Sequence, residues 1–88
     1  MRSVKFSPLA FEEFLSWRRD DPNIVQKILD LIEDIQQHPF EGLGKPEPLK
    51  YDLKGSWSRR ISLEDRLVYE VKGSDIFISK CRGHYGKK

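Results

Sequence analysis

The chain has 88 residues, a formal net charge of +2 and a hydrophobic content of 38%. This length predicts a single domain spanning residues 1–88, with a modest core that a binding partner would help to stabilise. Charged residues make up 34% of the chain, and no apolar run approaches the roughly 20 residues that a bilayer-spanning helix needs. These features exclude a membrane protein, and the N-terminus has no continuous apolar signal segment, so we expect a cytoplasmic protein.

The charges are distributed unevenly along the chain. Residues 1–44 carry 5 basic and 8 acidic side chains, whereas residues 45–88 carry 11 basic and 6 acidic ones. A cationic second half favours a polyanionic partner, although an ordinary solvated surface is the alternative. Cys81 is the one cysteine of the chain, so we expect a packed or half-exposed strand residue there rather than a disulfide or a zinc ligand.

The first 20 residues predict a short strand followed by a helix. Residues 3–7 alternate around Val4 and Phe6, which is typical of a strand. Ser7 followed by Pro8 is an N-cap signal, and the helix is expected to end near Arg19. We expect Phe11, Phe14 and Leu15 to face the core, with Glu12 and Glu13 facing solvent.

The next segment predicts a second, longer helix. Asp21 and Pro22 repeat the cap-then-proline signal, and apolar residues recur at helical spacing as far as about Gln37. These residues are Ile24, Ile28, Leu31, Ile32 and Ile35. His38 precedes a proline, which ends the helix, so we expect His38 to be a C-terminal cap.

The second half of the chain predicts a small sheet. Glycines and prolines indicate a loop at residues 40–48. Short strands are then expected within residues 51–53, 57–62, 66–71 and 76–82, joined by tight turns as in an antiparallel meander. The predicted fold class is α+β: an N-terminal strand and an α-hairpin packed on one face of a small, mainly antiparallel β-sheet.

Strand parity separates the two faces of this sheet. Leu67, Tyr69 and Val71 share one face, which we expect the helices to cover. Arg66, and with it Arg60, would then lie on the opposite face toward solvent. Together with Lys45, Lys50 and Arg82, these arginines suit a phosphate backbone, although a charged solvent face is the ordinary alternative.

Two further residues can transfer protons near such a face. Glu47 lies between two prolines that restrict its backbone, and histidines such as His84 titrate near neutral pH. RNA cleavage by its own 2′-hydroxyl needs a base, an acid and cations around the phosphate, which Glu47, His84 and arginine can supply. A solvated loop glutamate and an idle terminal histidine are the alternatives for each residue alone. No metal-ligand spacing or Walker loop occurs, so no cofactor is expected.

Two stretches carry a family resemblance. PFEGLGKPEPLKYDLKGSWSRRISLEDRLVYEV at residues 39–71, with CRGHY at residues 81–85, closely resembles the YoeB family of toxins in the RelE/ParE superfamily. The resemblance implies a RelE-like fold and the toxin of a type II toxin–antitoxin system. Such a toxin is a ribosome-dependent, metal-independent endoribonuclease that cleaves mRNA in the decoding (A) site and inhibits translation.

The resemblance also implies a role for individual residues. Glu47 is expected to be the general base, His84 the general acid, and Arg66 the residue that stabilises the transition state. Lys50 and Arg60 would hold phosphates, and Tyr85 would position the RNA, which aromatic rings do by stacking on unpaired bases. Residues 86–88 follow Tyr85, whereas similar toxins often end at the tyrosine, which puts a role of the terminal carboxylate in question.

The implied partners are the ribosome, mRNA, a YefM-like antitoxin with a flexible acidic segment, and a second copy of the chain in a homodimer. Two other functions stay open. One is a non-catalytic toxin that binds RNA or the ribosome, and the other is a ParE-like inhibitor of DNA gyrase. The joint presence of Glu47, Arg66 and His84 argues against gyrase inhibition, which needs no acid–base set.

Overall fold

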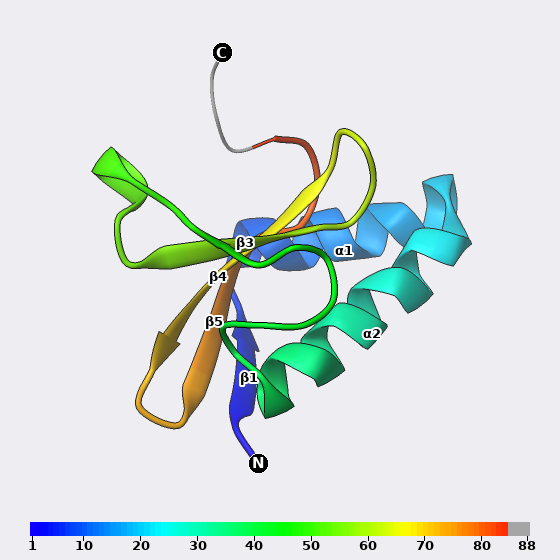
Figure 1. Cartoon of the computed structure of the whole chain (residues 1–88). Coiled ribbons are helices and arrows are strands. Elements are labelled where there is room, and N and C mark those ends of the chain that lie inside the picture. Colours follow the sequence, from blue (N-terminus) through cyan, green and yellow to red (C-terminus); the bar gives the residue numbers. More distant parts are fainter. Residues whose placement is uncertain (85–88) are drawn as a thin grey trace.

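A computed structural model of the chain, which describes residues 1–84, contains two helices on one face of a five-stranded sheet (Figure 1). The strand order is β1-β5-β4-β3-β2, with β1 parallel to β5 and every other pair antiparallel. The predicted α+β class is therefore confirmed. The elements are β1 (Ser3–Phe6), α1 (Pro8–Asp20), α2 (Pro22–Gln37), β2 (Glu47–Pro48), the 3-10 helix η1 (Tyr51–Leu53), β3 (Ser56–Arg60), β4 (Arg66–Lys72) and β5 (Asp75–Lys80).

The two helix starts differ in how they are capped. Ser7 Oγ accepts a hydrogen bond from Ala10 N at 3.0 Å, as its sequence predicts. Asp21 was expected to do the same for α2, but within the described chain its side chain makes no capping hydrogen bond. Its backbone serves both helices instead: Asp21 N donates to Trp17 O at 2.8 Å, and Asp21 O accepts from Ile24 N at 2.9 Å. One residue thus ends α1 and begins α2.

The buried face of α1 differs from the predicted one. Phe14 packs partly against the core, but Phe11 and Leu15 are 50% and 39% exposed. The fully or nearly buried residues of α1 are Ala10 and Trp17, and Glu13 turns inward rather than toward solvent. The reason is that α1 lies against the end of β5. There it buries only a narrow apolar strip, and Trp17 and Glu13 form hydrogen bonds with the backbone of Cys81.

The apolar stripe of α2 is confirmed. Ile28, Leu31 and Ile35 are 0% exposed and Ile32 is 8% exposed, and Ile24 packs against the same core. α2 ends at Gln37, and His38 is its C-cap, with His38 N donating to Asp34 O at 2.7 Å. Neither helix of residues 1–84 has the length and apolar content that crossing a membrane requires.

One predicted strand is wrong. Residues 51–53 form η1, in which Leu53 N donates to Lys50 O at 3.1 Å and Lys54 N donates to Tyr51 O at 3.0 Å. The physical reason is the φ of Tyr51, +57°, which lies in the left-handed region and is incompatible with a strand. The predicted loop at residues 40–48 also ends in a two-residue strand, β2. The other predicted strands are present.

The registers confirm the predicted faces. Directly opposed residues share a face, so the pairs Trp57–Tyr69 and Arg59–Leu67 lie on the helix side of the sheet. The pair Arg60–Arg66 lies on the other side, called here the open face. Alternation along β3 therefore places Arg59, next to Arg60 in sequence, inside the core, where it is 0% exposed.

The guanidinium of Arg59 uses all five of its N–H donors. Nε donates to the hydroxyl of Tyr69 at 3.2 Å, and that hydroxyl donates in turn to Pro39 O at 2.7 Å. Of the other four donors, one binds Asp34 of α2 and three hold the segment that leaves α2. Their acceptors are Asp34 Oδ2 (2.5 Å), Leu43 O (2.9 Å), His38 O (2.5 Å) and Glu41 O (3.0 Å).

Asp34 completes this network from α2. Its Oδ2 also accepts a hydrogen bond from Leu43 N at 3.0 Å, and the loop backbone comes so close that a Cβ at Gly42, whose φ is +117°, would clash with the carboxylate. Burial pushes the pKa of Asp34 upward, but hydrogen bonds from Arg59 and Leu43 and the charge of Arg59 outweigh it and hold that pKa below its ordinary value. The loop between α2 and β2 is thus held by two side chains, Arg59 of β3 and Asp34 of α2.

Replacing Arg59 by methionine should lower the free energy of unfolding by about 3–5 kcal/mol, because the half-buried Asp34 carboxylate and several carbonyls lose their charged partner. The matched control is Arg60→Met, one residue along the same strand on the exposed face, which should change stability by about 0.5 kcal/mol or less. Urea denaturation followed by circular dichroism measures both. Equal losses in the two variants would contradict the role given to Arg59.

Asp34 should make stability depend on acid pH. Since its folded pKa lies below its unfolded value, about 3.9, its contribution is complete above that value and is lost as pH falls through the folded pKa. Asp34→Asn should therefore be less stable than the wild type at pH 7, with a difference that shrinks as pH falls below about 4. A difference that stays constant over this range, in urea titrations at each pH, would refute this linkage.

Candidate active site on the open face

Glu47 reaches the open face through the short strand β2. It pairs with Ser58 of β3, and its side chain is exposed. The Arg59 network fixes the chain before it, and Leu49 fixes the chain after it: Leu49 is 6% exposed, and its N–H donates to Ser56 O at 2.9 Å. Glu47 is therefore a solvent-facing carboxylate on a backbone anchored at both ends.

Arg60 and Arg66 lie directly opposite each other at the ends of β3 and β4. Arg60 is exposed, and Arg66 is half-buried. Like charges at directly opposed positions destabilise a strand pair, and an anion bound between them would relieve this repulsion. Nη1 of Arg66 is oriented by three carbonyls of its own turn, those of Ser62 (2.9 Å), Leu63 (3.2 Å) and Asp65 (3.1 Å).

His84 is exposed and follows a glycine that is held from two directions. Asp65 Oδ1 accepts a hydrogen bond from Gly83 N at 2.7 Å, and Arg66 N donates to Gly83 O at 2.9 Å. Figure 1 shows this C-terminal segment beside the turn between β3 and β4. The structure thus brings Arg66 and His84 to the same end of the sheet.

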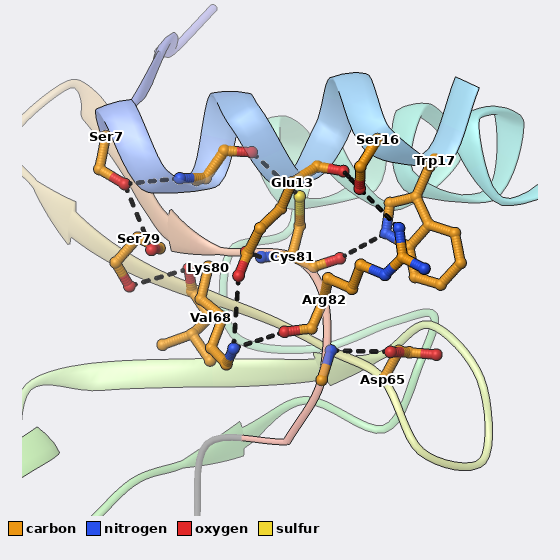
Figure 2. A network of polar contacts seen from close by, with 12 residues as sticks. Ser7, Glu13, Ser16, Trp17, Asp65, Val68, Ser79, Lys80, Cys81 and Arg82 are labelled. Carbon is orange, nitrogen blue, oxygen red and sulfur yellow. Dashed lines mark hydrogen bonds and ion pairs between the residues drawn. The ribbon is translucent and has the colours of Figure 1, made fainter. Parts of the chain in front are cut away.

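The C-terminal anchor fastens residues 80–82 to α1, as Figure 2 shows. Trp17 Nε1 donates to Cys81 O at 2.9 Å, and Cys81 N donates to Glu13 Oε1 at 2.7 Å. The Arg82 guanidinium lies 4.0 Å from the Trp17 ring centre. Further contacts join Arg82 to Ser16 Oγ (2.6 Å) and Asp20 Oδ2 (2.8 Å), and join Lys80 to Glu13 Oε2 (3.5 Å) and Arg82 O.

Cys81 lies at the centre of this anchor. Its side chain is 0% exposed, and its Sγ lies 3.3 Å from Ala10 O. Burial, with a smaller effect of the Glu13 charge, raises the pKa of the thiol to about 12. The thiolate required of a nucleophile is therefore scarce at neutral pH, and the packed role expected from the sequence is confirmed.

Three of the predicted site residues, Glu47, Arg60 and Arg66, lie on adjacent strands of the sheet. Glu47 pairs with Ser58, so it lies about 7 Å along the sheet from Arg60 and about 5 Å across it. Arg66 is one strand further, with His84 beside its turn. Lys50 is exposed at the start of η1, on the rim near Glu47. Tyr85 lies outside the described residues.

Several residues that position this site were not singled out from the sequence. They are Arg59, which holds the loop before Glu47, Glu13 and Trp17 of the C-terminal anchor, and Asp65. Among residues 1–84, no three histidine, cysteine, aspartate or glutamate side chains gather in a way that could hold a metal ion.

The fold recurs in solved proteins of very different sequence. YafQ from E. coli strain BL21(DE3) superposes with a TM-score of 0.73 over 96% of this chain and 94% of its own, at 15% sequence identity. Within that fold the sequence is more specific. Residues 6–85 match the family described as the YoeB-like toxin of bacterial type II toxin–antitoxin systems. The chain belongs to this family.

Individual relatives agree with this assignment. Toxin YoeB of Escherichia coli K12 is 50% identical over 80 residues, which cover 91% of this chain and 95% of the relative. A YoeB/ParE toxin from Agrobacterium tumefaciens has a TM-score of 0.92 at 45% identity, with 94% and 99% of the two chains covered. YoeB of Staphylococcus aureus has been solved as a dimer (TM-score 0.89, 44% identity, 96% and 98% covered) and in a YoeB–YefM complex (0.88, 42%, 97% and 99%).

Proposed function

We propose that this toxin is a ribosome-dependent mRNA endoribonuclease that cleaves mRNA in the decoding site and so inhibits translation. The observation that carries the proposal is that Glu47, Arg60 and Arg66 lie on one face of the sheet, with the backbone just before His84 bonded to the turn that precedes Arg66, in a chain of the YoeB family. These groups can supply a base, a charge stabiliser and an acid. The same proposal puts the protein in the cytoplasm, where its substrate is translated.

In the proposed reaction, the Glu47 carboxylate removes the proton of a ribose 2′-hydroxyl. The resulting oxyanion attacks the adjacent phosphorus, and the bond to the 5′-oxygen breaks, which leaves a 2′,3′-cyclic phosphate. The His84 imidazolium gives its proton to the departing 5′-oxygen, while Arg66 stabilises the charge that develops on the phosphorane. Arg60 and Lys50 hold the flanking phosphates, and Tyr85 stacks on a base. Every proton is carried by a protein side chain, so the reaction needs no metal.

The exposure of these groups supports dependence on the ribosome. Glu47, Arg60 and His84 are all exposed, so the protein offers the RNA a surface rather than an enclosed site. Placing a 2′-oxygen in line with its phosphorus takes tight positioning, which contributes several orders of magnitude to the rate of such reactions. On a ribosome the mRNA is already held, and the toxin then has to add only the acid, the base and the charge.

Glu47→Gln and His84→Gln should each lower the cleavage rate by about 10²–10⁴-fold, because each removes one proton transfer. Glu33→Gln, which makes the same change at an exposed glutamate of α2, is the matched control and should cleave as the wild type does. Primer extension on mRNA held in stalled ribosomes measures the cuts, with free RNA alongside. We expect cuts in the decoding site with ribosomes and none in free RNA.

Other outcomes of this experiment would identify the alternatives. Tight ribosome binding without cuts would make the protein a non-catalytic blocker. If nothing is cut, a supercoiling assay with DNA gyrase follows, and inhibition there with no effect on ribosomes would make it a ParE-like toxin. Cleavage that survives in the Glu47→Gln, His84→Gln double variant would overturn the acid–base assignment.

We further propose a homodimer and a YefM-like antitoxin as partners, by similarity to the Staphylococcus aureus YoeB dimer and YoeB–YefM complex. An acidic antitoxin segment would be attracted to the cationic second half of the chain and would cover the open face. Light scattering should give twice the chain mass for the toxin alone, and added antitoxin should abolish cleavage, with binding that weakens as salt rises. A toxin that stays monomeric, or cleavage that continues in the complex, would contradict these assignments.

A further inference from the structure

In the turn between β3 and β4, the Asp65 carboxylate uses one oxygen within the turn and the other outside it. Ser62 Oγ accepts hydrogen bonds from Glu64 N at 3.3 Å and Asp65 N at 3.1 Å, which closes the turn locally. Asp65 Oδ2 accepts from the Ser62 hydroxyl at 2.7 Å. The second oxygen, Oδ1, points away from the turn to the distant C-terminal segment, where it accepts from Gly83 N at 2.7 Å (Figure 2).

The contact at Gly83 is part of a two-point attachment. Gly83 N is held by Asp65, and Gly83 O is held by the backbone N–H of Arg66 at 2.9 Å. Two bonds on either side of one residue fix the orientation of its peptide groups, whereas one bond would leave it free to pivot. Gly83 also has a φ of +77°. Glycine adopts positive and negative φ about equally readily, so contacts with the rest of the chain must select this conformation.

What is fixed in this way is the approach to His84, the next residue. The C-terminal anchor ends at Arg82, so the two bonds to Gly83 are the last described backbone contacts before His84. Both come from the strand end that carries Arg66. Asp65 therefore connects Gly83, the residue before the proposed acid, with the strand end that carries the proposed charge stabiliser.

We propose that Asp65 is a positioning residue, which sets the distance and direction of His84 relative to Arg66 by holding Gly83. The inference rests on the proposed function, since it assigns Asp65 an effect on the acid step alone. It differs from a merely structural role in one respect: the effect of Asp65 on the rate passes through His84. RNA binding by Lys50 and Arg60 does not depend on it.

The first test compares single-turnover cleavage of ribosome-held mRNA by Asp65→Ala, Asp65→Asn and Glu64→Gln. Asp65→Ala should lower the rate at saturating toxin about 10²-fold, the effect typical of a small misplacement of a catalytic group, with the half-saturating concentration unchanged. Asp65→Asn keeps an oxygen that can accept from Gly83 N and should retain most of the rate. Glu64→Gln removes an exposed charge from the same turn and should match the wild type.

The second test is a double-mutant cycle with His84→Gln. If Asp65 acts through His84, Asp65→Ala should cost less than about twofold more once His84 is gone. An equal loss in both backgrounds, or an Asp65→Ala effect that appears as weaker ribosome binding with an unchanged saturating rate, would overturn the proposal.

A readout without cleavage separates this inference from the proposed function. In ¹⁵N relaxation and amide exchange, Asp65→Ala should lower the order and protection of Gly83, while Trp17 and Leu67 keep theirs and so report an intact fold. If the wild type cuts no mRNA, the proposed function fails, but this experiment still decides whether Asp65 orders the chain before His84. Unchanged order at Gly83 in Asp65→Ala would overturn the positioning role, whatever the cleavage assay gives.

Discussion

The buried Arg59 guanidinium is the interaction on which the open face depends. Desolvating a charge is expensive, and a buried ion pair often stabilises a fold no better than apolar residues would. Here the cost is offset because all five donors find acceptors, one of them the Asp34 carboxylate. The network therefore fixes the path of a loop that has little regular structure of its own, and this loop leads to Glu47.

The site is therefore assembled by contacts behind and beside it rather than by contacts among its own groups. Glu47 is fixed by the interior of the sheet, and His84 by α1 and the turn that precedes Arg66. An arrangement of this kind leaves the reactive groups exposed to a substrate while their backbones are restrained. It suits the proposed reaction, in which the ribosome presents the substrate.

The sequence pattern predicted those features that depend on local rules. The Ser7 cap, the α2 stripe and the two faces of β4 follow from capping preference and periodicity, and the structure has them. Arg59 was missed because a charged residue is rarely buried, although its parity with Trp57 already placed it on the inner face. The helix-like turn at residues 51–53 depends on a left-handed Tyr51 that no local rule anticipates. The inward Glu13 and the Asp65 contact depend on residues 68 and 18 positions away in the chain, which a periodicity cannot reveal.

The C-terminal anchor has a consequence for how the molecule folds. Its contacts join α1 to residues that are 62 to 71 positions later in the chain, so they carry a large loop-closure entropy and are gained only when most of the sheet is in place. A partly folded chain can contain the Arg59 network and still have no fixed path to His84. The proposed acid and the proposed base are thus brought together at the last stage of folding, so a chain that has not completed the sheet lacks the proposed site.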